Sequence, residues 1–150
     1  MNTTRSLSVL LVDDDPGDVL MIEEALEQLD SARVVHVVND GEEAVAFLRR
    51  LGRYADAPRP DVVLLDLNMP RMDGRQVLAE VKADEDLRTI PIIVFTTSQA
   101  PDDVVRSYSL HANAYVTKPI NLDELNDIIR RIDEFFGRII VLPGRNPLTD

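Results

Sequence analysis

Cysteine and tryptophan are absent from this 150-residue sequence, and aromatic residues make up only 5% of it. Without cysteine the chain can form neither a disulfide framework nor a thiolate metal site. No apolar run approaches the roughly 20 residues that a membrane-spanning helix needs. The N-terminal residues Met1 to Arg5 also lack the pattern of a signal peptide. We therefore expect a cytoplasmic protein that has no contact with a membrane.

Positive charge is also scarce, since 16 Lys and Arg residues stand against 27 Asp and Glu and the formal net charge is -11. Nucleic-acid phosphates would repel such a chain, so we expect no nucleic-acid partner. Hydrophobic residues nevertheless make up 45% of the sequence. A chain of this length and composition can bury a hydrophobic core that is stable without disulfide bonds. It has little room for a second domain.

Short apolar runs alternate with segments in which apolar residues recur at helical spacing. The runs with the length and composition of β-strands are 7–12, 34–38, 62–65, 90–95 and 114–116. A helical pattern follows each run, at 19–29, at 44–51, from residue 74, from residue 101 and at 122–136. This alternation predicts the α/β class, with a doubly wound five-stranded parallel sheet flanked by five helices.

The chain after the last predicted helix departs from this pattern. Residues 139–142 are Ile-Ile-Val-Leu, and Pro143 and Gly144 follow them. We assign residues 1–137 to the α/β domain and residues 138–150 to a C-terminal extension. Four consecutive apolar residues near a terminus favour docking or pairing over a solvated tail.

The last predicted helix carries more apolar residues than one buried face requires. Ile128, Ile132 and Phe136 share a face that should pack on the sheet, which leaves Ile129 and Phe135 nearer the rim. Exposed together with the apolar extension, these residues would form a patch of the size that usually marks an interface. We therefore expect a homodimer built on the last helix and the tail, with the same surface paired on both chains.

Polar residues fall at the ends of four of the predicted strands. These residues are Asp13 and Asp14 after the first strand, Asp66 after the third, Thr96 after the fourth and Lys118 after the fifth. In a parallel sheet all of these ends face the same way, and the loops beyond them are where ligands bind. We therefore expect side chains that are far apart in the sequence to form one site.

The acidic members of this set suggest a metal site. The carboxylates of Asp13, Asp14 and Asp66 would repel one another, and a hard dication such as Mg²⁺ or Mn²⁺ would relieve the repulsion. Asp14 and Asp66 could bind the ion directly, and Asp13 could bind it directly or through a water molecule. The backbone carbonyl of Asn68 could add another oxygen ligand. An isolated run such as residues 13–17, Asp-Asp-Asp-Pro-Gly, is more typical of a turn that caps a helix. The other residues at matching strand ends favour the metal site.

The same set suggests phosphoryl transfer. A carboxylate such as that of Asp66 can act as a nucleophile towards phosphorus and form an aspartyl phosphate. The metal and the ammonium of Lys118 would stabilise the charge on the phosphoryl oxygens. The hydroxyl of Thr96 could donate to the product.

Taken together, these residues resemble a response-regulator receiver domain over roughly residues 6–136. The matching features are the acidic cluster after the first strand, Asp66 within Leu65-Asp66-Leu67-Asn68-Met69-Pro70, Thr96, Lys118-Pro119, and Tyr115 three residues before the lysine. The resemblance implies a flavodoxin-like receiver fold and phosphorylation of Asp66 by a histidine kinase.

The resemblance also implies particular roles within the site. It places Mg²⁺ at Asp13, Asp14 and the carbonyl of Asn68, and it implies a cis peptide between Lys118 and Pro119. Thr96 and Tyr115 would act as the switch on phosphorylation, and the alternative for Tyr115 is half-buried packing on its strand with no switching role.

A narrower resemblance points to the single-domain regulators that partner phytochrome-type histidine kinases. It depends on residues 47–50, Phe-Leu-Arg-Arg, on residues 58–61, Pro-Arg-Pro-Asp, and on residues 96–98, Thr-Thr-Ser. An apolar tail after the last helix also fits this subgroup. These segments carry no chemistry of their own.

We expect a two-component response regulator that is a signalling protein and not an enzyme. No effector domain fits after residue 137, so its output should be contact with other proteins. Two alternatives remain open, namely a pseudo-receiver that binds partners without phosphate, and a phosphohydrolase with an aspartyl-phosphate intermediate. Such hydrolases usually carry a second Asp two positions after the nucleophile, where this chain has Asn68.

Overall fold

A single parallel sheet lies between two layers of helices in the computed structural model, which describes residues 7–29, 33–139 and 141. The strands are β1 (Leu7–Val12), β2 (Arg33–Val38), β3 (Val62–Leu65), β4 (Ile92–Thr96) and β5 (Ala114–Thr117). They follow the order β2-β1-β3-β4-β5, and each pair of neighbours is parallel. The predicted class and strand number are confirmed.

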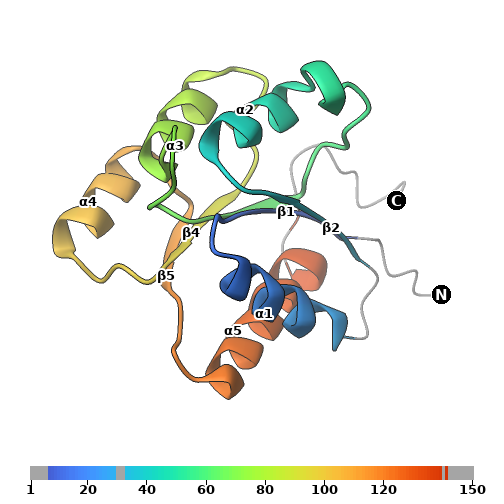
Figure 1. Cartoon of the computed structure of the whole chain (residues 1–150), viewed down its shortest axis with the longest axis vertical. Helices are drawn as coiled ribbons and strands as arrows, with labels where there is room; N and C mark the ends of the chain where they lie inside the picture. Colours follow the sequence, from blue (N-terminus) through green and yellow to red (C-terminus); the bar gives the residue numbers. More distant parts are fainter. Residues whose placement is uncertain (1–6, 30–32, 140, 142–150) are drawn as a thin grey trace.

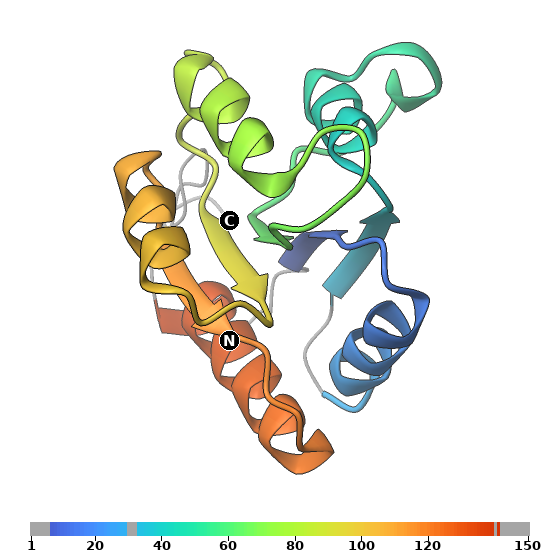
Figure 2. The same cartoon turned by 60° about the vertical axis from the view of Figure 1, so that its left-hand side comes forward.

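Helices cover both faces of this sheet. They are α1 (Pro16–Glu27), α2 (Gly41–Arg49), α3 (Gly74–Ala83), α4 (Pro101–Ser109) and α5 (Leu122–Glu134), with a 3-10 turn η1 (Gly52–Tyr54) and a π-helical turn η2 (Phe135–Ile139). In Figures 1 and 2, α1 and α5 cover one face, α2 and α3 cover the other, and α4 lies beside the edge strand β5.

Two cores form on the two faces because successive side chains of a strand point in opposite directions. Along β1, Leu10 and Val12 belong to the core under α2 and α3. Val9 and Leu11 belong to the core under α1 and α5. The central strands β1, β3 and β4 are therefore almost entirely apolar, as is typical of parallel strands covered on both faces.

Polar residues at the helix starts fix where most helices begin. Asp40, Asp73 and Asn121 each accept hydrogen bonds from backbone N–H groups of the first turn that follows. Asp73 also forms a capping box with Gln76. Pro101 occupies the first turn of α4. These starts agree with the sequence prediction.

The apolar face of α5 differs from the expected one. Phe135 is 46% exposed and lies at the rim as predicted, but Ile129 is 1% exposed and lies in the core with Leu125 and Phe136. The placement of Ile129 at the rim was wrong. Leu125, Ile129 and Phe136 are four and seven residues apart, so they form one helical stripe, and the sheet packs on this stripe.

The predicted apolar tail lies mostly outside the described residues, which omit 140 and 142–150. Val141 is described and is exposed. The role of the tail in a homodimer therefore stays a prediction. Within the described ranges, no helix is long and apolar enough to cross a membrane.

Candidate functional site

The ends of the strands bring the predicted site residues to one edge of the sheet. Asp13 follows β1 directly. The backbone hydrogen bonds between neighbouring strands also extend to the residues that follow β3 and β5. The N–H of Asp66 donates to the carbonyl of Val12 at 2.9 Å, and the N–H of Lys118 donates to the carbonyl of Thr96 at 2.8 Å. The sheet itself therefore fixes the backbone of the residues that carry the functional groups.

Three carboxylates meet at this edge. Asp13, Asp14 and Asp66 each offer one oxygen, and these oxygens lie within 4.8 Å of one another. The cluster contains oxygen donors only, which suits a hard divalent cation. The cluster therefore fits a divalent metal.

Lys118 supplies the only cation found at this cluster within the described chain. Its ammonium nitrogen Nζ lies 2.6 Å from Oδ2 of Asp13, 3.0 Å from Oδ2 of Asp18 and 3.7 Å from Oδ2 of Asp66. Lys118 is itself almost fully buried. The ammonium therefore reaches the Asp66 carboxylate from the fifth strand, as the sequence predicted.

The pKa shifts in this cluster come from two causes, burial and the charges of neighbouring groups. Burial raises the pKa of Asp13, and the nearby charge of Asp66 adds to this, although Lys118 acts in the opposite direction. Burial alone would lower the pKa of Lys118, but its bond to Asp13 and the charges of Asp13 and Asp66 raise it overall. The carboxylates thus stabilise the charged form of Lys118. The charged form of Asp13, the most buried of the three carboxylates, is not stabilised enough to offset its burial.

Asp18 is a site residue that sequence reasoning missed. It lies in the first turn of α1, and its carboxylate accepts a hydrogen bond from Lys118 at 3.0 Å. The sequence assigned no role to it because it falls outside the acidic run that follows β1. Asp18 could have been predicted from its position, because the first turn of α1 lies close to the end of β1 and an acid in that turn can reach the site.

The acidic run itself divides into two roles. Asp13 and Asp14 join the carboxylate cluster. The carboxylate of Asp15 instead accepts hydrogen bonds from the N–H groups of Gly17 and Asp18 at 2.9 and 3.3 Å. Asp15 is the N-cap of α1. The interpretation as a helix cap therefore holds for this one residue of the run.

Thr96 ends β4 beside the strand that carries Asp66. Its side chain is fully buried, and its hydroxyl oxygen has no hydrogen-bond partner within the part of the chain that the structure describes. An unpaired buried hydroxyl costs free energy, so its presence needs an explanation, and a ligand that completes the hydrogen bonding is one. This agrees with the predicted hydroxyl donor to a phosphoryl group.

Glycines hold the loop after Asp66 close to the sheet. A Cβ atom on Gly74 would lie 2.3 Å from the carbonyl oxygen of Asp66, and a Cβ on Gly41 would lie 2.0 Å from the carbonyl oxygen of Met72. The N–H of Gly74 also donates to the carbonyl of Leu67 at 2.9 Å. Only glycine allows α3 to begin this close to the Asp66 backbone.

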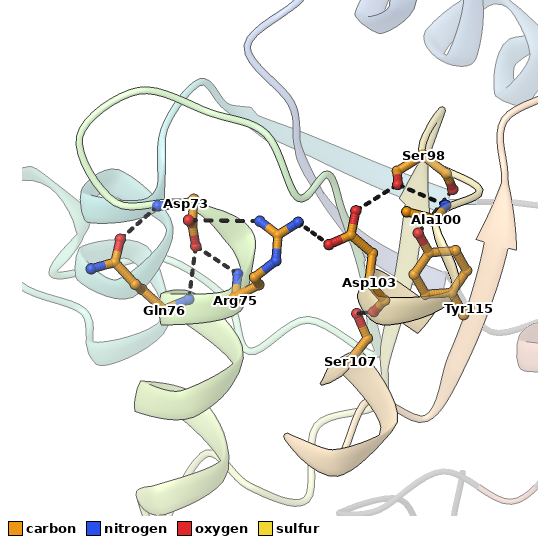
Figure 3. A network of polar contacts seen from close by, with 8 residues as sticks. All are labelled: Asp73, Arg75, Gln76, Ser98, Ala100, Asp103, Ser107 and Tyr115. Carbon is orange, nitrogen blue, oxygen red and sulfur yellow. Dashed lines mark hydrogen bonds and ion pairs between the residues drawn. The ribbon is translucent and has the colours of Figure 1, made fainter. Parts of the chain in front are cut away.

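Tyr115 lies beside the loop between β4 and α4 and outside the carboxylate cluster. Its hydroxyl donates to the carbonyl of Ser98 at 2.9 Å (Figure 3). Its backbone N–H donates to the hydroxyl of Tyr108 at 3.1 Å. The ring is therefore tied to the segment that follows Thr96, although its action as a switch stays a prediction. Asn68 is exposed, and the role of its carbonyl as a ligand also stays a prediction.

The expected cis peptide between Lys118 and Pro119 is not found. All peptide bonds among the described residues are trans, so this expectation was wrong. A trans bond before proline is favoured by about 0.5–1 kcal/mol. The trans bond here is compatible with the contacts of Lys118 to Thr96 and to the acidic cluster.

Comparison with known proteins gives consistent matches. A family model described as the response regulator receiver domain matches residues 9–130. Response regulator Rcp1 of Synechocystis sp. is 43% identical over 136 residues, which are 91% of this chain and 92% of Rcp1. The structure of the phosphorylated cyanobacterial phytochrome response regulator RcpA is 46% identical with a TM-score of 0.89, over 93% of this chain and 100% of RcpA. The Mn²⁺-bound form of Rcp1 is 42% identical with a TM-score of 0.86, over 92% of this chain and 99% of Rcp1.

Proposed function

We propose that Asp66 is the phospho-accepting residue of this chain, which belongs to the response-regulator receiver family and is a two-component response regulator. The observation that carries the proposal is the setting of the Asp66 carboxylate. Its oxygen lies 3.7 Å from the ammonium of Lys118 and within 4.8 Å of oxygens from Asp13 and Asp14. Asp13 shares the strand-end position and the cluster, but its two carboxylate oxygens already accept hydrogen bonds from Lys118 at 2.6 Å and from the N–H of Asp15 at 2.9 Å. Asp66 is the more exposed of the two, which leaves its carboxylate the better placed to attack.

The chemistry follows from this setting. An oxygen of Asp66 attacks the phosphorus of a phosphohistidine, the new P–O bond forms an acyl phosphate, and the P–N bond to the imidazole breaks. Lys118 stabilises the negative charge that moves onto the phosphoryl oxygens. Thr96, whose hydroxyl lacks a partner in the described structure, donates a hydrogen bond to the phosphoryl group.

A divalent metal completes the site in this proposal. Asp13, Asp14 and Asp66 would hold Mg²⁺ or Mn²⁺, with the backbone carbonyl of Asn68 as a further ligand. When bound, the ion neutralises charge on the transferred phosphoryl group. The all-oxygen donor set and the similarity to a protein crystallised with Mn²⁺ support this assignment.

The proposed phosphodonor is a histidine kinase of the phytochrome type. The similarity to regulators that carry this description supports the choice of kinase. Exposed apolar side chains also lie on the segments that follow β1 and β5, namely Leu20 and Met21 on α1 and Ile120 and Leu122 between β5 and the first residue of α5. Single exposed apolar residues are ordinary, but in this proposal these four supply the apolar contacts to the kinase that brings its histidine to Asp66.

The proposed output is contact between proteins, including a homodimer. In this proposal the C-terminal extension, residues 138–150, and α5 together form the surface that pairs with a second copy of the chain. An apolar groove of about 670 Å³ supports the choice of surface, and it is lined partly by Ile128, Phe135, Phe136 and Val141. The chain then acts as a cytoplasmic signalling protein and not as an enzyme with a diffusing substrate.

Intact-mass measurement after incubation with acetyl phosphate and Mg²⁺ tests the central assignment. The wild type should gain one phosphoryl group and Asp66→Asn should gain none. Asp102→Asn, which removes an exposed carboxylate in the first turn of α4, is the control and should be labelled like the wild type. Labelling of Asp66→Asn would overturn the assignment, and an unlabelled wild type would favour the pseudo-receiver.

A further inference from the structure

A chain of polar contacts joins the first turn of α3, the first turn of α4 and Tyr115 (Figure 3). The guanidinium of Arg75 forms an ion pair with one carboxylate oxygen of Asp103. The other oxygen of Asp103 accepts a hydrogen bond from the hydroxyl of Ser98 at 2.6 Å. The carbonyl of Ser98 in turn accepts from the hydroxyl of Tyr115 at 2.9 Å.

One end of this chain begins at the strand end that carries Asp66. Arg75 directly follows Gly74, whose missing side chain lets α3 begin against the Asp66 carbonyl. Arg75 is also held from its own helix, since its guanidinium lies 3.7 Å from the carboxylate of the N-cap residue Asp73. Arg75 is therefore the next residue after a glycine that lies against the Asp66 backbone.

The other end lies in the first turn of α4, a helix that buries little apolar surface. Ser107 is the only buried residue of α4, while Val105 is 65% exposed and Tyr108 is 49% exposed. Ala100 at the N-cap position makes no side-chain capping bond. Because apolar burial contributes little here, polar contacts must fix the first turn of α4. The contact between Arg75 and Asp103 is the one that reaches α3.

The carboxylate of Asp103 is well suited to this task. Its hydrogen bond from Ser98 and its ion pair with Arg75 lower its pKa below the usual value. It is therefore charged at neutral pH and can bind both groups at once. Charge-assisted hydrogen bonds of this kind are about twice as strong as neutral ones.

We propose that Arg75 and Asp103 are positioning residues that tie Ser98 to α3 and so hold the Tyr115 side chain against the loop between β4 and α4. The pair couples the backbone at Asp66 to the surface formed by α4 and β5. This route is separate from the hydroxyl of Thr96, which reaches the site along β4. Only the coupling to Asp66 rests on the proposed function, since the contacts are present without phosphorylation.

The first test uses the unphosphorylated full chain. In Arg75→Gln the backbone amides in the first turns of α4 should exchange with solvent roughly fivefold faster, as expected for the loss of one charge-assisted bond. The NMR resonances of the Tyr115 ring, identified by comparison with Tyr115→Phe, should shift as well. Arg75→Lys, which keeps the charge, should restore most of both signals.

A matched control separates this effect from simple loss of charge. Arg130→Gln removes an arginine that is paired with Asp127 on the exposed side of α5, and it should leave both signals unchanged. Ser98→Ala combined with Arg75→Gln should show less than the sum of the two single effects, because both act through Asp103. If Arg75→Gln behaves like Arg130→Gln, the positioning role is refuted.

The second test asks whether the pair carries information from Asp66. Beryllofluoride, a phosphoryl mimic, should shift the Tyr115 resonances of the wild type, and Arg75→Gln should reduce that shift at least twofold under saturating mimic. An equal shift in both proteins would overturn the coupling. No response of the wild type at all would contradict the phosphorylation of Asp66, while the exchange measurements on the free chain would still decide the positioning role.

Discussion

Gly74→Ala is expected to destabilise the fold and to disturb the phosphorylation site together. The added Cβ would lie 2.3 Å from the carbonyl oxygen of Asp66 and 2.8 Å from the Cα atom of Leu67. Both obstacles are backbone atoms of the strand end, so neither can rotate away. Gly74 does not have a positive φ angle, so an alanine could adopt its backbone conformation. The loss must therefore come from the clash alone.

The magnitude follows from two opposing effects. Overpacking against a rigid neighbour typically costs about 1–3 kcal/mol. Replacing glycine by alanine in a helix returns at most about 1 kcal/mol. The contact of 2.3 Å with rigid backbone places this clash at the upper end of that range. We therefore expect the free energy of unfolding to fall by about 2 kcal/mol, which for a chain of this size lowers the melting temperature by about 4–8 °C.

Urea unfolding measures the free energy of unfolding of Gly74→Ala, with Gly137→Ala as the control. No described atom lies within 4 Å of the place that a Cβ on Gly137 would occupy, so replacement of Gly137 should be neutral or stabilise the chain by up to about 1 kcal/mol. Gly74→Ala should also be labelled more slowly by acetyl phosphate, because α3 displaces the Asp66 carbonyl. Equal midpoints and equal m-values for the two variants would refute the packing argument.

Four further predictions concern the site and the surface. Mg²⁺ at ten times its dissociation constant should stabilise the wild type by about 1.4 kcal/mol, and a thermal melt of Asp14→Ala should show no such gain. Thr96→Val should keep the free energy of unfolding in urea within about 1 kcal/mol of the wild type or raise it, since the hydroxyl loses no partner; a larger loss would reveal a hidden hydrogen bond. The pKa of Asp103 is lowered in the folded chain, so Asp103 adds stability that is present above about pH 5 and is lost as the pH falls through its folded-state pKa. The difference between wild type and Asp103→Asn in urea unfolding should therefore disappear in acid, and a difference that grows in acid would contradict the sign. Light scattering should show a dimer for the full chain and a monomer after truncation at Gly137, and an unchanged dimer would exclude the tail from the interface.

The parts of the fold that the sequence predicted are those that depend on local patterns. Apolar runs between helical segments define the five strands, and the parallel arrangement then brings Asp13, Asp66 and Lys118 to one edge. No distance had to be known for this inference. The direction of the strands alone was enough, because the carboxyl ends of parallel strands lie together.

The parts that were missed depend on how helices pack. Ile129 was placed at the rim because two neighbouring stripes of α5 are both apolar, and periodicity cannot say which one meets the sheet. The ion pair between Arg75 and Asp103 joins two helices whose relative position follows from packing and not from either pattern. The cis bond before Pro119 came from the family resemblance, and no residue of this chain required it.

The contact between Lys118 and Asp13 also determines when the site can be completed during synthesis. The two residues are 105 positions apart in the sequence. At roughly 5–20 residues per second, the ribosome adds the lysine several seconds after the aspartate. During that interval the acids after β1 and β3 have no ammonium from β5 to offset their repulsion. The strand end that carries Asp66 is therefore among the last parts of the domain to reach its final electrostatic state. It reaches that state only when β5 has joined the sheet and brought Lys118 beside Asp66.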